Sequence, residues 1–439
     1  MIDRLRQVAG DDAVRDGSWA ALRVHGMAPA AVVSPADADQ AAAVLRVCSE
    51  NGWIVEAAGA GTWLDWGRPP RRVDVILSSE RLAGISEYSP ADLTISVGAG
   101  TPLAEVAETV AFDRQMLGLD PPARPGATAG ATIATASAGP LRFSIGTPRD
   151  IVLGLEMVTG DGRAVRIGGR VVKNVAGYDL VRLVVGSRGT LGFITRAHLR
   201  LRPAPEADVT ALFTAAGPAP LVDLALGRAA SVWPAAIEIF GPATASALGL
   251  ERAWTLGVRC RGNEPFVMAA RQRLQSLNNG AAPRMPDEFE AARLWESLSS
   301  LEAHASIAFR LASLPGRLGQ LLELAGVPLQ TAADEPWNQK SDNTLDEWLL
   351  AAHAGSGIVR IWRADPPNGI DPGALAERVA GMRSGLAADG GTATLPVIPA
   401  RMLDLIDPFG AVGPVLEIMR GVKTVFDPAG ILLPGRFVV

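Results

Sequence analysis

Residues that build metal and redox centres are scarce in this 439-residue sequence. It has two cysteines, Cys48 and Cys260, and four histidines. Two thiols cannot ligate an iron–sulfur cluster of the four-cysteine kind, so another chain or a soluble acceptor must take any electrons passed onward. No two histidines have the HxxxH or HExxH spacing of a helical zinc site, and we predict no metal site in this chain. Both cysteines lie in apolar periodic segments and are expected to be buried thiols.

Long apolar runs and a strong net charge are also missing. No uninterrupted apolar stretch is long enough to cross a bilayer, and residues 1–17 contain no apolar stretch typical of a secretory signal. A net charge of −5 gives no reason to expect binding to nucleic acid or to an anionic membrane surface. Apolar residues make up 48% of the chain and charged residues 20%, which is typical of a globular protein. We therefore expect a globular, cytoplasmic protein without a membrane span.

The length predicts more than one domain. Residues 30–110 predict two strand–helix units in succession, and the first helix opens at Ser34–Asp37, where Ser34 can cap and Asp37 completes a capping box. Residues 160–162, Gly-Asp-Gly, lie between two apolar runs and predict a β-hairpin. The Pro-rich sequence 202–205 predicts a domain boundary.

The second half of the chain alternates between strand-like and helix-like segments. This alternation predicts an antiparallel sheet with helices on one face. A helix around 413–425 should end at Asp427-Pro428. The strand candidates are 209–213, 235–240, 254–260, 306–311, 358–362 and 392–397.

Three segments can bring backbone groups close to a ligand. Residues 59–62, Gly-Ala-Gly-Thr, follow a strand, and such a turn can hold a pyrophosphate with its N–H groups. This turn is not a Rossmann fingerprint, because the third glycine position is Leu64; alone it is equally compatible with a plain tight turn. Residues 126–140 are nearly all small and permit close approach, although a buried connecting loop has the same composition. Residues 173–195 contain further glycines before a strand.

The order and spacing of these segments resemble the FAD-binding domain of the vanillyl-alcohol oxidase / p-cresol methylhydroxylase (PCMH) flavoproteins. Within that superfamily the chain resembles the FAD-binding E subunit of bacterial glycolate oxidases. The resemblance covers residues 25–205 and 400–439. The residues between these two ranges resemble the family only in general plan. The sequences that carry it are Gly59–Thr62, Asp120–Pro122, Thr128–Ala134, Ser137–Pro140, Arg149–Val152, Gly168–Leu180, Gly189–Ile194 and Phe426–Arg436.

The resemblance implies an α+β fold in three parts. Residues 1–205 would form a PCMH-type FAD-binding domain of two α/β subdomains. Residues 206–398 would form a cap domain with an antiparallel sheet flanked by helices, and residues 399–439 would return to the FAD domain.

The resemblance also implies where FAD binds. Its pyrophosphate would lie on residues 58–62. Asp150 and the backbone of Ile194 would contact the adenosine side or its neighbouring loop, and Arg436 would return near the flavin edge. The implied cofactor-binding residues are Ala58, Gly59, Ala60, Gly61, Thr62, Thr128, Gly130, Ala131, Ser137, Gly139, Asp150, Ile194 and Arg436.

Some positions depart from the family pattern. Ala131 replaces a glycine and adds a methyl group where backbone approaches the cofactor, and Leu433 replaces an asparagine of the tail. Some relatives attach flavin through a histidine in the first loop, but this chain has Thr62-Trp63 there, so we predict non-covalent FAD. The metal-binding His-x-Gly-Asp-Gly-Asn run and His-Glu pair of catalytic relatives are missing, and His304 and His353 are expected at the surface.

Three functions follow as hypotheses, and the catalytic residues stay unassigned. The first is an FAD-binding subunit of a glycolate oxidase-type complex that oxidises 2-hydroxy acids such as glycolate or D-lactate, beside a catalytic flavoprotein subunit and an iron–sulfur subunit. Such a subunit would reach the inner membrane only through its partners. The second is a self-sufficient FAD oxidoreductase of a hydroxy acid or alcohol. The third is a non-catalytic scaffold that has lost the cofactor, a hypothesis consistent with the extra methyl group of Ala131. Lys173 and Arg142 are candidate cations near the flavin, or ordinary surface pairs.

Overall fold

The chain folds into two compact units. The computed structural model describes residues 1–18, 21–122, 126–170, 178–277, 282–303, 305–326, 348–364 and 371–438. The first unit comprises residues 1–138, 146–204 and 411–439, and the second comprises 139–145 and 205–410. Two segments differ from the expected boundaries. Residues 139–145 pack with the second unit, and that unit continues to 410 because Met402 and Ile406 are buried in its core.

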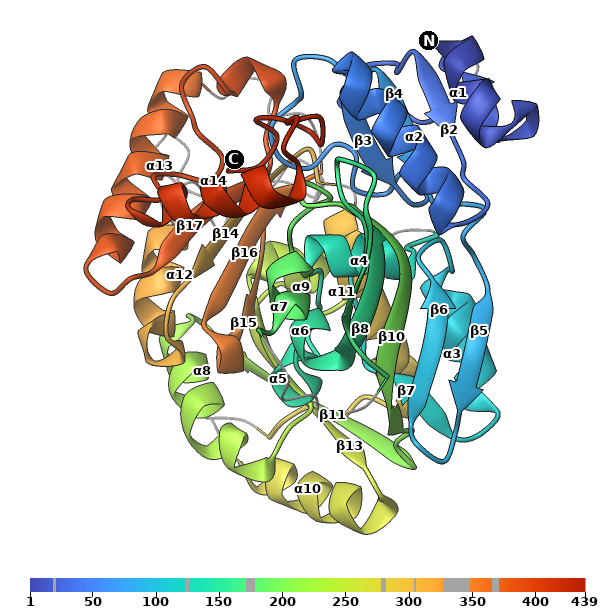
Figure 1. Ribbon diagram of the computed structural model, residues 1–439. Helices are drawn as coiled ribbons and strands as arrows, with labels where there is room; N and C mark the ends of the chain where they lie inside the picture. The colour runs from blue at the N-terminus through green and yellow to red at the C-terminus, as the bar shows by residue number, and fades with distance from the viewer. Residues whose placement is uncertain are drawn as a thin grey trace. The chain divides into compact units, whose positions relative to one another are not determined.

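The first unit begins with a four-stranded sheet in the order β1-β2-β4-β3. Strands β2, β4 and β3 are parallel, and β1 runs antiparallel to β2. Helix α2 buries Val44, Leu45 and Cys48 in the same core as this sheet (Figure 1). The elements are α1 (Ile2–Ala9), β1 (Val14–Asp16), β2 (Ala31–Val33), α2 (Ala38–Asn51), β3 (Val55–Ala58) and β4 (Val75–Ser78).

The start of α2 lies later than the sequence suggested. Asp37, and not Ser34, is the N-cap, and its carboxylate accepts a hydrogen bond of 2.8 Å from the backbone N–H of Gln40. The Ser34 hydroxyl instead donates to Glu80 at 2.8 Å. Both residues are good caps, and the tertiary contact with Glu80 decides between them.

The second sheet of the first unit is antiparallel, in the order β5-β6-β10-β8-β9, with β7 also paired to β10. The hairpin expected around residues 160–162 is present as β8 and β9. The expected C-terminal helix is α14, which ends before Asp427. The elements are β5 (Ile85–Ser89), β6 (Thr94–Gly98), α3 (Leu103–Ala111), β7 (Gln115–Leu117), α4 (Ala129–Thr135), α6 (Pro148–Ile151), β8 (Val152–Val158), β9 (Ala164–Gly168), α7 (Leu180–Val184), β10 (Phe193–Pro203) and α14 (Val415–Phe426).

The second unit is built on a seven-stranded antiparallel sheet in the order β11-β13-β12-β15-β16-β14-β17. Each strand candidate from the sequence is present, and β15 is an additional strand. The strands are β11 (Ala207–Ala215), β12 (Ala236–Phe240), β13 (Trp254–Gly262), β14 (Ile307–Ala312), β15 (Leu349–His353), β16 (Ile358–Arg363) and β17 (Thr392–Val397).

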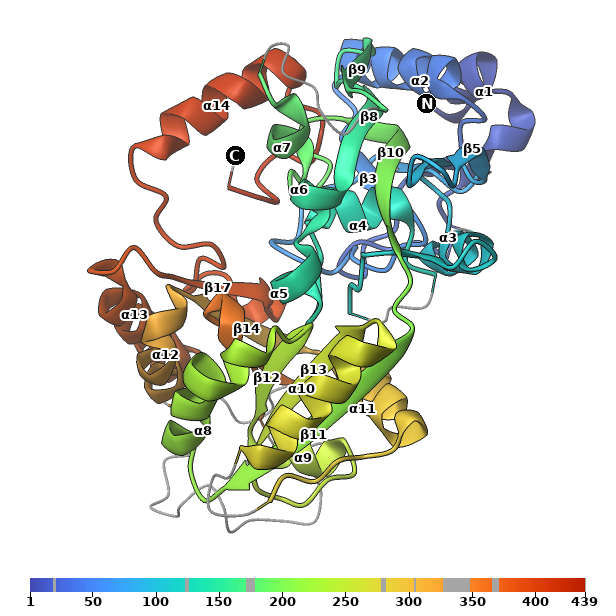
Figure 2. The same ribbon diagram turned by 90° about the horizontal axis from the view of Figure 1, so that it is seen from below.

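Helices cover both faces of this sheet, which corrects the expectation of helices on one face. The side chains of β12 alternate between two cores: Ile237 and Ile239 lie in one, and Ala236 and Phe240 in the other. Helices α8 (Ala219–Leu224), α10 (Glu264–Ser276), α12 (Leu318–Gly326) and α13 (Pro372–Ala387) contribute to the first core, and α9 (Pro242–Ala247) and α11 (Glu288–Ala303) to the second. Figure 2 shows α10 lying over β11 and β13.

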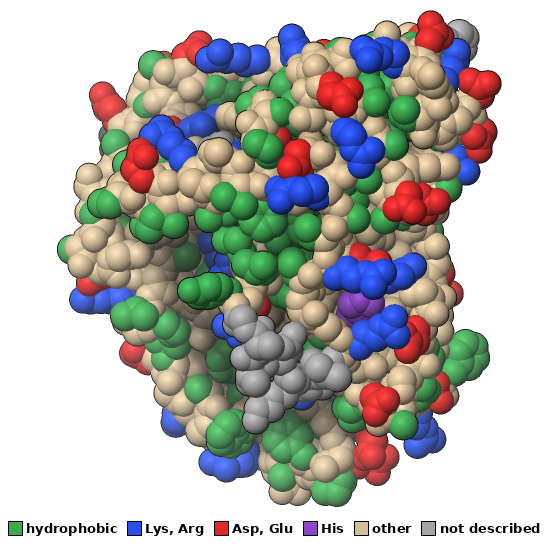
Figure 3. All heavy atoms as spheres, in the orientation of Figure 1, with side chains coloured by type: hydrophobic (Ala, Val, Ile, Leu, Met, Phe, Trp, Pro, Cys, Tyr) green, Lys and Arg blue, Asp and Glu red, His purple; other side chains and the backbone are tan. Residues whose placement is uncertain are grey.

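The surface agrees with the small net charge. Basic and acidic side chains are interspersed on the face shown in Figure 3. Among the described residues, no helix combines the length and apolarity that a bilayer span requires. Cys48 and Cys260 are both fully buried, as expected, and burial raises the pKa of each thiol to about 12.

Candidate functional site

A cavity of about 690 Å³ lies inside the first unit. Its walls come from the loop after β3, from α4, from the turn before β10 and from the C-terminal tail. The lining residues are Glu56–Gly59, Gly61–Leu64, Trp66, Ser79, Ala99, Gly130, Ala131, Ala134, Thr135, Arg188, Gly189, Gly192–Ile194 and Arg436.

The loop after β3 approaches the rest of the cavity with its backbone. Gly61 has φ +83°, a left-handed conformation that favours glycine. A Cβ atom on Gly59 would collide with the Thr128 hydroxyl and would lie 3.2 Å from its methyl carbon. The loop follows a parallel strand at its carboxyl end, where α/β sheets commonly bind ligands.

Helix α4 forms the opposite wall and is held tightly to the end of β6. The backbone N–H groups of Ala129 and Gly130 donate to the carbonyls of Thr101 and Ala99 at 2.9 and 2.8 Å. A Cβ on Gly130 would lie 2.7 Å from the Cβ of Ala99. The small-residue segment is therefore backbone laid against backbone, which is why glycine occupies position 130. Ala131 lines the cavity, and its methyl group narrows it.

Two buried hydroxyl groups lie on the segment of α4, on residues that do not themselves line the cavity. The hydroxyl oxygens of Thr128 and Thr132 are buried and have no hydrogen-bond partner among the described residues. Buried polar groups are almost always satisfied, so these hydroxyls fit a bound molecule with acceptor oxygens, such as a pyrophosphate. Gly59 and Gly61 leave room for its approach.

A buried ion pair crosses the cavity wall from strand β3 to the tail. Arg436 Nε lies 3.3 Å from Glu56 Oε2, and the guanidinium also donates to the backbone carbonyl of Leu64. Both side chains are nearly inaccessible to solvent. Burial raises the pKa of Glu56 to about 7, although the charge of Arg436 opposes this rise. The pair links the cavity to the C-terminal tail.

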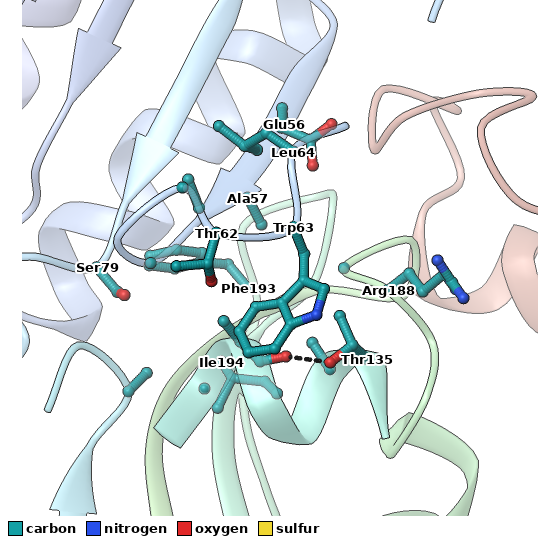
Figure 4. A pocket seen from close by; sticks show the side chains of 18 of the residues that line it. Glu56, Ala57, Thr62, Trp63, Leu64, Ser79, Thr135, Arg188, Phe193 and Ile194 are labelled. Carbon is teal, nitrogen blue, oxygen red and sulfur yellow. Dashed lines mark hydrogen bonds between the residues drawn. The ribbon is translucent and has the colours of Figure 1, made fainter. Parts of the chain in front are cut away.

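Aromatic rings lie beside Arg188, one of the residues that line the cavity. The guanidinium carbon of Arg188 lies 5.6 Å from the centroid of the Trp66 ring and 5.5 Å from that of Phe437, within cation–π range. Figure 4 shows the indole of Trp63 reaching from the β3 loop toward Thr135 of α4. Arg188 and Arg436 place two cations on the wall, and guanidinium groups are well suited to phosphate oxygens.

The structure brings most of the sequence-predicted residues to this cavity. Those that line it are Ala58, Gly59, Gly61, Thr62, Gly130, Ala131, Ile194 and Arg436. Thr128 lies directly behind Gly59.

Five of the predicted residues do not line the cavity: Ala60, Thr128, Ser137, Gly139 and Asp150. The Asp150 carboxylate instead accepts hydrogen bonds from the backbone N–H and hydroxyl of Thr147, at 2.8 and 3.1 Å, and completes a capping box of α6. Gly139 belongs to the second unit. The sequence 171–177, including Lys173, lies outside the described residues.

Sequence reasoning missed the side chains that complete the walls, namely Glu56, Trp63, Trp66, Arg188 and Phe193. Glu56 carries one available signal, since it is a glutamate within an otherwise apolar strand. Such a residue is rarely buried without a charged partner.

A second polar site lies in the second unit, and it corrects the expectation for His353. His353 is 2% exposed on strand β15, not at the surface, and its Nδ1 contacts the Glu238 carboxylate on β12. Arg360 donates to the other oxygen of Glu238 at 3.0 Å and pairs with Glu302 of α11 at 2.5 Å. Burial lowers the pKa of His353 well below its usual value, so the ring is neutral. Burial raises the pKa of Glu238 to about 7.

Known proteins agree with a cofactor cavity in the first unit. A family model described as an FAD binding domain matches residues 29–168. The glycolate oxidase subunit GlcE of Escherichia coli is 31% identical over 360 residues, which cover 80% of this chain and 84% of that subunit. The chain belongs to the PCMH-type FAD-linked oxidoreductases. Within this family it is similar to glycolate oxidase subunits and to D-lactate dehydrogenases.

Other relatives of this FAD-linked oxidoreductase extend over nearly its whole length. D-lactate dehydrogenase of Archaeoglobus fulgidus is 28% identical over 436 residues, covering 93% of this chain and 91% of that enzyme. The solved structure of p-cresol methylhydroxylase with bound substrate has a TM-score of 0.72 at 16% identity and covers 99% of this chain and 95% of that chain. The α+β fold class is thus confirmed. The chain is an FAD-binding oxidoreductase, and its relatives include FAD-linked 2-hydroxy acid oxidoreductases.

Proposed function

We propose that this chain is the FAD-binding subunit of a glycolate oxidase-type complex that oxidises 2-hydroxy acids such as glycolate or D-lactate. The observation that carries the proposal is the cavity between the β3 loop and α4, with glycines where side chains would collide and with the buried, unpartnered hydroxyls of Thr128 and Thr132 at the start and in the middle of α4. The similarity to GlcE over most of its length supports the same function.

The cavity supports FAD held without a covalent bond. Within the part of the chain that the structure describes, the residues that line it include no histidine, cysteine or tyrosine, side chains that could attach a flavin. Residues 58–62 would hold the pyrophosphate, and Gly130, Ala131 and Ile194 would contact the rest of the cofactor. Bound FAD would supply the acceptor for the hydride and electrons of the substrate.

Partner subunits would complete the reaction. A catalytic flavoprotein subunit and an iron–sulfur subunit would act beside this chain in the cytoplasm, and contact with the inner membrane would come through them. The two cysteines of the chain are buried in different units, so an iron–sulfur cluster would belong to another subunit.

A stand-alone enzyme is the second candidate, and one observation favours it. The D-lactate dehydrogenase of Archaeoglobus fulgidus matches this chain over nearly the full length of both proteins. In that case the chain would reduce its own flavin with a 2-hydroxy acid and pass the electrons to a soluble acceptor.

The visible flavin spectrum tests these functions. We expect the purified protein to be yellow, to release its flavin into the supernatant on acid precipitation, and to stay oxidised with glycolate until partner subunits are added. Bleaching by glycolate or D-lactate without partners would support the stand-alone enzyme. A colourless protein that stays free of flavin after incubation with FAD would overturn both and leave a scaffold role.

A further inference from the structure

A lysine of α14 lies where three segments of the first unit meet. The ammonium group of Lys423 donates to the backbone carbonyls of Thr190 and Leu432 at 2.7 Å each, and to the Asp427 carboxylate at 2.6 Å. Its side chain is only 11% exposed. Burial lowers the pKa of Lys423, and the charge of Asp427 opposes this shift. An ammonium has three N–H donors, and all three are used here, so the geometry requires the charged form.

The first of these segments is the turn before β10, which forms one wall of the cavity. Thr190 lies between Gly189 and Gly192, and both glycines line the cavity. The Thr190 hydroxyl closes the turn by donating to the Ser187 carbonyl at 2.7 Å, and the Thr190 carbonyl accepts from Lys423. Lys423 therefore holds this wall from behind, since it does not line the cavity itself.

The second segment is the C-terminal tail, residues 427–438, which lies along β3 (Figure 1). Leu432 pairs in parallel with Val55, and the backbone N–H of Val55 donates to the Ile431 carbonyl at 2.9 Å. The residues of β3 that follow Val55 line the cavity, and so does Arg436 farther along the tail. The tail and β3 therefore form one wall, and Lys423 contacts it at the carbonyl of Leu432.

The third contact, with Asp427, fixes the direction in which the tail leaves α14. The Asp427 carboxylate accepts hydrogen bonds from the backbone N–H groups of Ile431 and Leu432 at 3.1 and 2.8 Å, and the residue is 2% exposed. A Cβ on Gly160 would collide with this carboxylate, so the β8–β9 hairpin packs closely against it. A buried carboxylate is costly without a charged partner, and Lys423 is that partner.

The tail is strained directly beyond this junction. Leu433 is fully buried and has φ +48°, a left-handed conformation that leucine rarely adopts. Such strain persists only where the surrounding structure holds the chain in place. Lys423 holds the carbonyl before Leu433, and Arg436 after it donates to the backbone carbonyl of Leu64. Without Lys423 we expect this part of the tail to separate from β3.

We propose that Lys423 is a positioning residue of the FAD cavity, which it keeps closed by tying the turn before β10 to the tail along β3. A cavity that is closed only part of the time binds its ligand more weakly, in proportion to the fraction of closed molecules. The proposal rests on FAD binding alone. It therefore applies equally to a subunit of a complex and to a stand-alone enzyme.

Fluorescence titration of the flavin-free, full-length protein with FAD tests this role. Lys423→Met removes the charge and keeps a side chain of similar length. We expect it to weaken FAD binding by about tenfold to hundredfold, because charge-assisted hydrogen bonds that keep the cavity closed are lost. Arg420→Met is the matched control, since Arg420 lies on the same helix but is exposed and paired with Glu417 at 2.7 Å. Its FAD affinity should equal that of the unchanged protein, and equal affinity in Lys423→Met would overturn the proposal.

Hydrogen–deuterium exchange separates a positioning role from a general loss of stability. In the flavin-free protein, well below its melting temperature, Lys423→Met should speed amide exchange in residues 187–194 and 431–436, because local opening exposes these amides. Exchange in β13 of the second unit should stay unchanged. Unchanged exchange in the two cavity segments, or faster exchange across both units, would contradict the proposal.

Lys423→Arg keeps the positive charge and tests the proposal if Lys423→Met does not fold. A planar guanidinium cannot direct three N–H groups of one nitrogen at three acceptors, so FAD binding should still be weaker than in the unchanged protein. Equal affinity would again count against the proposal. Failure of the proposed function has a different result: an unchanged protein that binds no FAD contradicts that function, while amide exchange still decides whether Lys423 holds the two walls.

Discussion

The cavity of the first unit and the buried charge cluster of the second unit (Glu238, His353, Arg360 and Glu302) are built by different means. The cavity is formed largely by backbone and by residues with little or no side chain, such as Gly59, Gly61 and Gly130. The cluster is formed by long polar and charged side chains, Glu238 and Arg360 on separate strands and Glu302 on a helix. A backbone-built site depends on space, so adding one carbon should damage it. A site built from charges depends on balance, so removing one partner should damage it.

The largest effect is expected from breaking the charge balance. Glu238→Ala should lower the free energy of unfolding by about 3–5 kcal/mol, because a buried cation and a buried histidine lose their partner. Urea unfolding followed by tryptophan fluorescence measures the change. Arg317→Gln removes an exposed ion pair in the same unit and should cost about 0–1 kcal/mol. An equal loss of unfolding free energy in the two variants would show that the buried charge cluster stabilises the fold no more than an exposed ion pair.

The next effect is expected from filling the cavity wall. Gly130→Val should lower stability by about 1–3 kcal/mol through overpacking against Ala99 and should prevent retention of FAD. The flavin absorbance of the purified variant is the measurement. Gly421→Ala is the control, since nothing lies within 4 Å of a Cβ at this position of α14. Full flavin content in Gly130→Val would contradict a backbone-built cavity.

A pH effect should be shared by the two regions. Burial raises the pKa of both Glu56 and Glu238 to about 7, above the ordinary value of 4.5. The folded state then binds these protons more tightly, so the free energy of unfolding falls as pH rises from about 4.5 to about 7. Glu56→Gln should remove part of this dependence and leave the part due to Glu238. An unchanged slope in unfolding experiments across this range would rule out a raised pKa at Glu56.

The smallest effect is expected at Ala131. Removing its methyl group widens the cavity, so Ala131→Gly should strengthen FAD binding by less than about tenfold, which corresponds to less than about 1.4 kcal/mol. Glycine within α4 should cost roughly 0.5–1 kcal/mol of stability. Fluorescence titration with FAD measures the affinity. Weaker binding would mean that the methyl group contacts the cofactor favourably.

Local patterns in the sequence were sufficient for much of the fold and for part of the cavity. The hairpin at Gly160–Gly162 and the strands of the second unit follow from alternation and turn residues, which act over a few positions. Gly59, Gly61 and Gly130 were identifiable because a close backbone approach needs glycine at fixed places in a short segment. Strand β15 was missed because its residues, Leu-Leu-Ala-Ala-His, include two leucines and two alanines, which favour helix over strand.

Contacts between residues distant in the sequence determined the helix cap and the charge contacts that local patterns did not predict. The choice of Asp37 over Ser34 as the cap of α2 depends on Glu80, which is distant in the sequence. The position of His353 could not be read locally, because its partner Glu238 lies 115 residues away and each residue alone looks like a surface group.

The sequence by itself therefore determined a PCMH-type chain with backbone-rich segments, since the small residues of each segment, such as 59–62 and 126–140, lie close together along the chain. Only the tertiary structure decided which charges meet. Strand order in the seven-stranded sheet brings His353 opposite Glu238 and puts Arg360 on the same face. Strand order is set by the packing of whole strands and helices, which no short segment encodes.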